Sequence, residues 1–283
     1  MRTLTSLIVF LSFLSFTLSA QSWQWGIAGG STNNMQSSSD YNNINTITTD
    51  NNGNIYTLGV VGAQNLEVDQ IPLNGFSTTG PASTADILVS SFSKNGAHRW
   101  SKVIGGATGD YGHALKTDSL GHVYLSGIIV NQGPSSTAVH FDSDTTLPQS
   151  GAVDSLKKIM FLVQYDTLGN FKWLKMPEPD TVSSTNQFGN ISFPYRMDVS
   201  QDGHIYWHCR LLPGQFSWAH NNIITKEGDY ILHFDHKGQM LEHITLDMHS
   251  EGIFSYERGE IQFARNPQNG RYYIGGIHED RRP

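Results

Sequence analysis

The chain has 283 residues, and only 15% of them are charged, compared with roughly 25% in an average soluble domain. The 18 basic and 25 acidic residues give a formal net charge of −7, which excludes a basic nucleic-acid-binding protein because no excess of Lys and Arg is available for phosphates. Apolar residues make up 38% of the chain, enough for a sizeable core, so the composition also argues against disorder.

The first twenty residues have the three parts of a secretory signal peptide. Arg2 gives a positive start, the apolar run Leu7–Phe16 follows, and Leu18-Ser19-Ala20 ends with small residues, so we expect cleavage after Ala20. A membrane anchor is the alternative, but a spanning helix needs about 20 apolar residues and this run has roughly half that number. We therefore expect a secreted or cell-surface protein with no stable membrane insertion once residues 1–20 are removed.

Two Gly-centred motifs alternate along residues 21–283. Copies of the first are Asp50–Tyr56, Asp118–Tyr124, Ser200–Tyr206 and, more loosely, Asn266–Tyr273, with Gly53, Gly121, Gly203 and Gly270 spaced by 68, 82 and 67 residues. Copies of the second are Ile87–Trp100, Met160–Trp173 and, more loosely, Ile231–Leu241, around Gly96, Gly169 and Gly238. The series Trp25, Trp100 and Trp173 also recurs, with Leu241 taken as the next equivalent position.

Both motifs predict β-hairpins. Alternating apolar residues run into D-x-x-G, where Asp can bond its own backbone and Gly takes the left-handed conformation of a hairpin with a bulge. After the turn Phe171 and Trp173 alternate with Lys172, the period of two that is expected for strands. Each repeat of about 70 residues therefore holds four strands.

Tandem four-stranded antiparallel units favour an all-β fold of the β-propeller type, because neighbouring blades can bury the two faces of each unit. A β-sandwich and a linear β-solenoid are the alternatives, and a solenoid would have shorter repeats. We expect blades at approximately residues 25–100, 100–173 and 173–241, a partial blade at 241–283, and the recurring Trp as a wedge between blades.

The best-preserved repeat carries a family resemblance. Trp100-Ser101-Lys102-Val103-Ile104-Gly105-Gly106, Gly109-Asp110-Tyr111-Gly112, Asp118–Gly127 and Tyr165–Trp173 follow one another. This order resembles the bacterial β-propeller repeat often called the SBBP repeat, which reads W-x-x-x-x-G-G, D-x-G, D-x-x-G-N-x-Y-x-x-G and a closing strand with D-x-x-G and W. The third repeat departs from it, because Met176-Pro177-Glu178-Pro179 replaces the Gly-Gly element.

The resemblance implies an exported or surface protein of the Bacteroidetes type. Many such proteins end in a C-terminal sorting domain that a type IX secretion system reads, and no such domain is visible in this sequence. About 3.5 repeats are present, so we expect an incomplete propeller. A four-bladed ring with an abbreviated last blade is the alternative.

The candidate chemical residues favour no active site. His204 and His208 would lie about 13 Å apart on a strand, too far for one metal ion, and His233 and His236 belong to a hairpin turn. Asp50–Asn54 has neither the ligand pattern nor the helices of an EF-hand. Glu178 and Asp180 are two carboxylates in a Pro-rich loop. The Gly29-Gly30 and Gly105-Gly106 pairs open no helix that could bind phosphate.

The one cysteine, Cys209, is expected to pack in a strand rather than to act as a nucleophile, and no disulfide or Cys-based zinc site can form within the chain. G-x-S-x-G, H-E-x-x-H and P-loop motifs do not occur. We therefore expect no catalytic, cofactor-binding or metal-ligating residues, and no cofactor.

The sequence favours a non-enzymatic scaffold that presents loops for binding or adhesion at the cell exterior. The long segments Gln64–Asp86 and Asn131–Leu156 are the expected contact surfaces, because binding residues tend to lie on loops held by a rigid frame. They are rich in Ser, Thr and Gly, which suits a glycan or a surface protein as ligand. The alternative is a propeller enzyme, a polysaccharide hydrolase or lyase with an axial active site, but equivalent positions vary between repeats (Asn54, His122, His204, Arg271).

Overall fold

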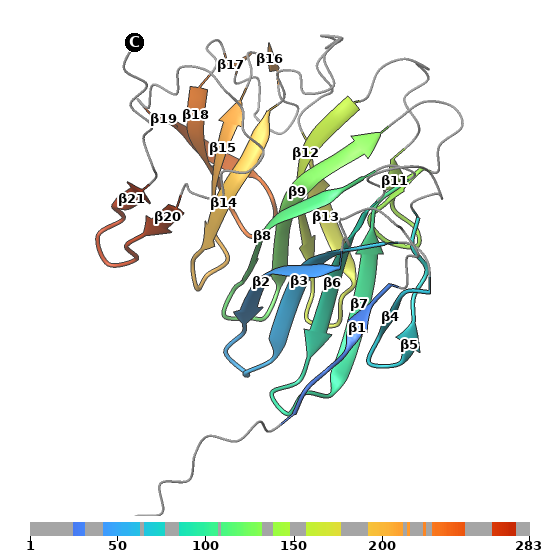
Figure 1. Cartoon of the computed structure of the whole chain (residues 1–283). Coiled ribbons are helices and arrows are strands. Elements are labelled where there is room, and N and C mark those ends of the chain that lie inside the picture. Colours follow the sequence, from blue (N-terminus) through green and yellow to red (C-terminus); the bar gives the residue numbers. More distant parts are fainter. Residues whose placement is uncertain are drawn as a thin grey trace, which may run out of the picture.

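The fold is built from antiparallel β-sheets that follow one another along the chain (Figure 1). The computed structural model describes residues 25–31, 42–62, 65–76, 85–106, 109–131, 138–147, 157–176, 192–211, 214–215, 223–224, 228–246 and 262–275. The described residues contain strands and no helix, which confirms the predicted all-β class. The predicted signal peptide lies outside them.

Three four-stranded sheets form the body. The first sheet contains β2 (Asn43–Thr49), β3 (Ile55–Val61), β6 (Asp86–Phe92) and β7 (His98–Ile104). The second contains β8 (Tyr111–Thr117), β9 (Val123–Asn131), β12 (Lys157–Tyr165) and β13 (Phe171–Lys175). The third contains β14 (Phe193–Val199), β15 (Ile205–Leu211), β18 (Gly228–Phe234) and β19 (Met240–Leu246). In each sheet the spatial order is the order along the chain.

Short strands accompany this body. Gly29–Gly30 (β1) pairs with the ribbon of Glu67–Val68 (β4) and Ile71–Pro72 (β5). Two further ribbons are Val139–His140 (β10) with Thr146–Leu147 (β11), and Gly214–Gln215 (β16) with Ile223–Ile224 (β17). A last hairpin joins Gln262–Arg265 (β20) to Tyr272–Gly275 (β21). Each connection between the second and third strands of a sheet thus carries a two-stranded ribbon.

The first strands of successive sheets lie side by side. Strand β2 contacts β8, β8 contacts β14, and β14 contacts β20. The sheets fan out from this inner row, as Figure 1 shows. This is a propeller-like arrangement of four-stranded antiparallel sheets. The expected repeat boundaries, Trp100, Trp173 and Leu241, lie inside the outermost strands β7, β13 and β19.

The Gly-centred motifs form the predicted tight turns, four of them with the sequence D-x-x-G. The glycines of these turns, Gly53, Gly96, Gly121, Gly169, Gly203, Gly238 and Gly270, have φ between 70° and 83°. In the first turn the Asp50 carboxylate accepts the backbone N–H groups of Asn52 and Asn54 at 2.9 Å. Asp118, Asp166 and Asp235 accept equivalent bonds. The Asp therefore satisfies donors that the turn would otherwise leave unpaired.

Each recurring Trp packs against the second hairpin turn of the following sheet. A Cβ atom placed on Gly169 would lie 2.7 Å from the ring of Trp100, and one on Gly238 would lie 2.9 Å from that of Trp173. The indole N–H of Trp100 also donates to the Thr167 carbonyl at 3.1 Å. Trp25 has the same relation to Gly96. The predicted wedge between units is confirmed.

The predicted equivalence of Leu241 with these tryptophans is wrong. Trp100 lies opposite Ser91, and Trp173 lies opposite Gln164. In the third sheet the same cross-strand position, opposite His233, belongs to Glu242. Leu241 is the bulge residue that precedes it, and its side chain is exposed. The apolar character of Leu241 suggested the wrong alignment, whereas counting four residues from each turn Gly gives the correct one.

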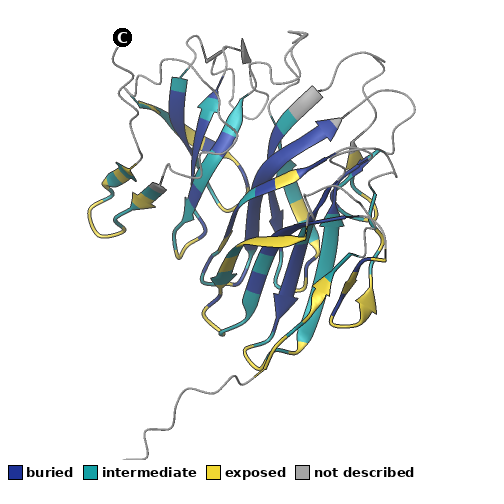
Figure 2. Ribbon diagram, viewed as in Figure 1, coloured by how far each residue is buried: buried dark blue, intermediate teal, exposed yellow. Residues whose placement is uncertain are grey.

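The core lies between the sheets. One buried cluster joins the first and second sheets and includes Leu58, Val89, Leu125 and Phe161. A second joins the second and third sheets and includes Tyr124, Leu162, Met197, Trp207 and Cys209. Figure 2 shows the buried residues concentrated in the central strands. Cys209 is fully buried, and burial raises the pKa of its thiol well above the usual value, so its predicted packing role is confirmed.

Candidate functional site

A β-bulge occurs at the third residue of the first strand of every sheet. In β8, for example, Gly112 lies opposite Gly127 and Ala114 opposite Ser126, which leaves His113 as the extra residue. Asn45 and Tyr195 are the corresponding residues in β2 and β14. Bulges re-aim side chains and are frequent beside active sites. Three successive inner strands therefore present one redirected side chain each, from the same position.

The neighbouring strand has glycine where the bulged strand approaches most closely. A Cβ atom on Gly59 would lie 2.2 Å from the Asn43 carbonyl oxygen, and one on Gly127 would lie 2.4 Å from that of Tyr111. These are the glycines that end the Y-x-x-G part of the first motif. The motif therefore encodes the bulge as well as the turn. In the third sheet Cys209 takes the equivalent place, opposite Pro194.

The bulge residues join neighbouring inner strands. The Asn45 side-chain amide donates to the Gly112 carbonyl at 3.4 Å. The His113 ring packs edge-on against Phe193, with ring centroids 4.7 Å apart. The Tyr195 ring lies 5.0 Å from that of His208. Because these residues lie near the start of each first strand, they occupy the edge of the sheets from which the long connections also leave.

Titratable groups gather beside the last two bulges, and we call His113, Phe193, Tyr195, Arg196, His208 and Asp229 the inner cluster. His208 and Asp229 are buried, and His208 Nε2 lies 3.8 Å from Asp229 Oδ1. Burial, with the nearby Arg196 charge, lowers the pKa of His113 and that of His208 to about 4. Burial, with the Asp229 charge, raises the pKa of Tyr195 to about 12. At neutral pH the cluster thus contains two neutral imidazoles and a protonated phenol.

The inner cluster offers aromatic faces, imidazole nitrogens and a guanidinium group. This set can stack on and hydrogen-bond a polar ligand, and neutral imidazole can also accept a proton. The cluster is not recognisable in the sequence because its members come from four strands. The repeated position could have been found from the turns, since Asn45, His113 and Tyr195 each lie five residues before the first turn residue.

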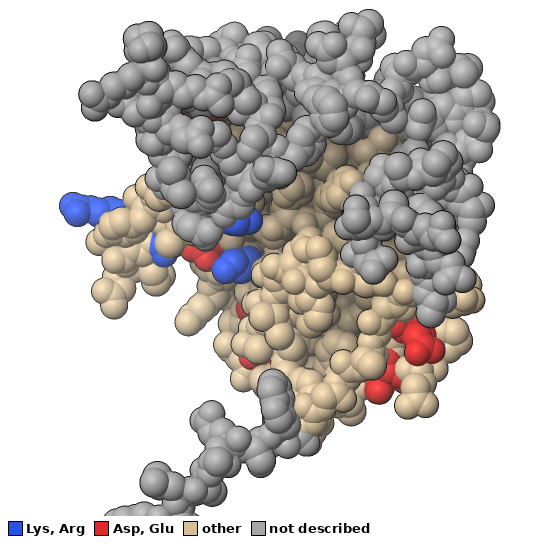
Figure 3. All heavy atoms as spheres, viewed as in Figure 1, with Lys and Arg blue, Asp and Glu red and all other residues tan. Residues whose placement is uncertain are grey.

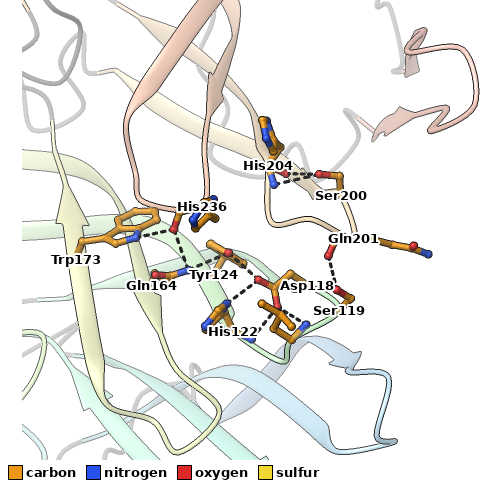
Figure 4. A network of polar contacts seen from close by, with 11 residues as sticks. Asp118, Ser119, His122, Tyr124, Gln164, Trp173, Ser200, Gln201, His204 and His236 are labelled. Carbon is orange, nitrogen blue, oxygen red and sulfur yellow. Dashed lines mark hydrogen bonds and ion pairs between the residues drawn. The ribbon is translucent and has the colours of Figure 1, made fainter.

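A polar network at the opposite edge ties the second and third sheets together (Figure 4). Tyr124 donates to the Asp118 carboxylate at 3.0 Å and accepts a bond from the Gln164 amide at 2.9 Å. The Gln164 amide also contacts the carbonyl of His236 in the next sheet, at 3.3 Å. The Ser119 hydroxyl donates to the Gln201 carbonyl across the same junction. These residues hold the second and third sheets together. Asp50–Asn54 of the first sheet forms the predicted hairpin turn.

A buried carboxylate pair holds the Gly-Gly element. Asp110 accepts the backbone N–H groups of Gly106 at 2.9 Å and Val130 at 2.7 Å, and Asp86 accepts that of Phe76 at 2.7 Å. Both side chains are fully buried. Burial, with the nearby Asp86 charge, raises the pKa of Asp110 well above its ordinary value. This Gly-Gly element therefore packs against the side chains of Asp86 and Asp110.

The described parts of the two long segments pack partly onto the body. Leu66 and Val68 of the first segment are buried, and so are Val139 and Phe141 of the second. Phe76 stacks on His140 with ring centroids 4.3 Å apart, which joins the two segments to each other. Large portions of both segments lie outside the described residues, as do Glu178 and Asp180.

The comparisons with known proteins leave the family open. No protein-family model matches the chain, and no curated protein matches it. Within the described residues no group of three His, Cys, Asp or Glu side chains is placed to hold a metal ion. No helix in the same part of the chain is long and apolar enough to cross a membrane.

Proposed function

We propose that the protein is an exported, non-enzymatic β-propeller scaffold that binds carbohydrate or protein ligands at the cell exterior. One observation carries the proposal: tight turns occupy one edge of the three sheets, whereas the ribbon-bearing connections and the bulge residues share the other. The edge with tight turns is used for contacts between sheets. The edge with long connections is the binding face.

The proposed scaffold is a ring of blades that belongs to the SBBP-repeat family. The sheets would be blades of an SBBP-type propeller, secreted after removal of residues 1–20. The neighbouring inner strands and the Trp contacts support this interpretation. The signal sequence supports secretion.

The chemistry of the binding face favours an uncharged polar ligand. Aromatic rings are available on both the inner strands and the connections, including Phe193, Tyr195 and Phe76. Charged side chains form only small groups on the described surface seen in Figure 3. Sugar rings combine apolar faces with hydroxyl groups, so stacking and neutral hydrogen bonds suit them better than ion pairs do.

The inner cluster favours one second candidate, a polysaccharide lyase or hydrolase. The neutral His113 could accept a proton, and the protonated Tyr195 could donate one. Perturbed pKa values of this kind concentrate at functional sites, although structural ion pairs also produce them. His113 and Tyr195 lie on the inner strands β8 and β14, where an axial active site would be.

A glycan array combined with a polysaccharide-degradation screen separates the two candidates. We expect the full chain to bind a subset of glycans without producing new reducing ends or unsaturated sugars. Tyr195→Phe and His113→Gln should weaken binding at least tenfold, and Tyr273→Phe, on the exposed face of β21, should have no effect. Turnover of any polysaccharide that Tyr195→Phe abolishes would establish the enzyme instead. Absence of both binding and turnover would contradict both candidates.

A further inference from the structure

Two histidines of the third sheet present ring nitrogens to the same point. His204 Nδ1 lies 2.8 Å from His233 Nε2, although the residues are 29 positions apart in the chain. His204 ends the turn before β15, and His233 lies in β18 beside the strand that follows this turn. We call these two residues the histidine pair.

Each imidazole of the histidine pair has a carboxylate at its other nitrogen. His233 Nδ1 lies 3.0 Å from Glu242 Oε1, its direct cross-strand neighbour. His204 Nε2 lies 3.8 Å from Asp202 Oδ2. A carboxylate on the distal nitrogen is the usual arrangement around metal-bound histidine, because it fixes the orientation and the tautomer of the ring.

The second sheet shows why such a pair does not form at the equivalent position there. His122 occupies the position of His204, but its Nδ1 is bonded to the Asp118 carboxylate at 2.7 Å. In the third sheet Ser200 stands where the turn Asp would be, and its hydroxyl bonds the His204 backbone instead. The His204 ring is therefore released from the turn and faces the next strand. The residue paired with the following tyrosine is His233 here, opposite Tyr206, and Gln164 in the second sheet, opposite Tyr124.

We propose that the histidine pair binds a divalent transition-metal ion of the zinc type. Zinc–nitrogen bonds of about 2.0–2.1 Å in tetrahedral geometry place two ligand nitrogens roughly 3.3 Å apart, so the rings need to separate by only about half an ångström. Water molecules complete the coordination. The carboxylates of Asp202 and Glu242 attract a cation to this place. They outnumber the positive charge of Arg265, whose guanidinium lies 4.2 Å from the centre of the Tyr206 ring.

The ion can reach this site from solvent. The side chain of His204 is 31% exposed and that of His233 is 13% exposed. The Tyr206 ring stacks on His233 with centroids 4.4 Å apart and holds it in place. The site is separate from the inner cluster, so its occupation does not depend on the binding function proposed above.

Zinc titration of the tag-free full chain tests the proposal, with calorimetry to count bound ions. We expect one site in the micromolar range that is lost in His204→Gln and in His233→Gln. Glu242→Gln should weaken it about 10- to 100-fold, because it removes the carboxylate that orients the ligand. His243→Gln is the matched control, since it changes the neighbouring residue on the same strand and should leave affinity unchanged.

A spectroscopic measurement covers variants that fail to fold. Cu²⁺ added in equimolar amount to the unchanged protein should give an electron paramagnetic resonance spectrum with hyperfine splitting from two imidazole nitrogens. The proposal is overturned if zinc binds no more tightly to the unchanged protein than to folded His204→Gln, or if His243→Gln weakens binding equally. It is also overturned if copper shows a single nitrogen ligand, in which case the 2.8 Å contact is an ordinary hydrogen bond between the two imidazoles.

Discussion

At the scale of single residues, burial between the sheets shifts the pKa values of ionisable groups in the direction that favours their neutral forms. His208 is fully buried, and its pKa of about 4 means that folding excludes its charged form at neutral pH. Asp110 is affected in the opposite sense, because burial raises its pKa and favours the protonated acid. These residues therefore make stability depend on pH in two opposing ways.

The contribution of His208 to the stability of the protein should fall as the pH falls from about 6.5 to about 4. In this window the unfolded chain binds a proton at His208 and the folded chain does not, so protonation favours unfolding. The shift corresponds to at most about 3 kcal/mol for one such group. Urea unfolding at pH 7 and pH 4.5 should show a smaller loss in His208→Leu, by about 2 kcal/mol. His98→Leu, outside the inner cluster, should retain the full loss. Equal losses in all three proteins would contradict the prediction.

At the scale of elements, each hairpin turn is also a contact between sheets. Gly169 needs its positive φ for the turn and its missing side chain for Trp100. Gly270 has a similar φ, but a Cβ atom there would meet nothing closer than Arg265 at 3.7 Å. Comparing Gly169 with Gly270 therefore separates the need for a positive φ from the need for a missing side chain.

Gly169→Ala should destabilise the protein by about 2–4 kcal/mol, because backbone strain adds to a steric clash with the indole ring. Gly270→Ala should cost only about 1 kcal/mol, since it introduces strain alone. Thermal unfolding of both variants measures the difference. Equal costs would show that Trp100 moves away freely and contributes little to the junction.

Turns and wedges could be predicted from the sequence because their residues are close together in the chain. The D-x-x-G pattern contains all the donors and acceptors of the turn, and the Trp recurs at a fixed distance from Gly. The histidine pair depends on strand register, which no short segment specifies. Leu241 is a different case, because counting four residues from Gly238 identifies Glu242 without any knowledge of strand register. The sequence places His204 near His208 along one strand, whereas the partner of His204 is His233 on the neighbouring strand.

At the scale of the whole molecule, stability is distributed over junctions between neighbouring sheets. Two buried clusters support the three complete sheets, whereas the described side chains of β20 and β21 are half-buried or exposed. In such arrays each unit is stabilised mainly by its nearest neighbours. The last hairpin should therefore open more easily than the sheets before it.

Hydrogen exchange followed by mass spectrometry should show this gradient. Amides of β9 and β15, which lie between two strands of their own sheet and beside the buried clusters, should exchange slowest. Amides of β20 and β21 should exchange at least tenfold faster at pH 7. Uniform protection from β2 to β21 would mean that the hairpin is as well supported as the sheets.

The contact between Trp and the turn Gly of the following sheet has a direction, and this has a consequence for how such a chain can change length. Trp100 of the first sheet meets Gly169 of the second, and Trp173 of the second meets Gly238 of the third, by the same geometry. A duplicated unit would bring its own indole ring and its own glycine, so both of its new boundaries would be complementary at once. Gene duplication could thus lengthen or shorten the array by whole units while every existing junction kept its original residues.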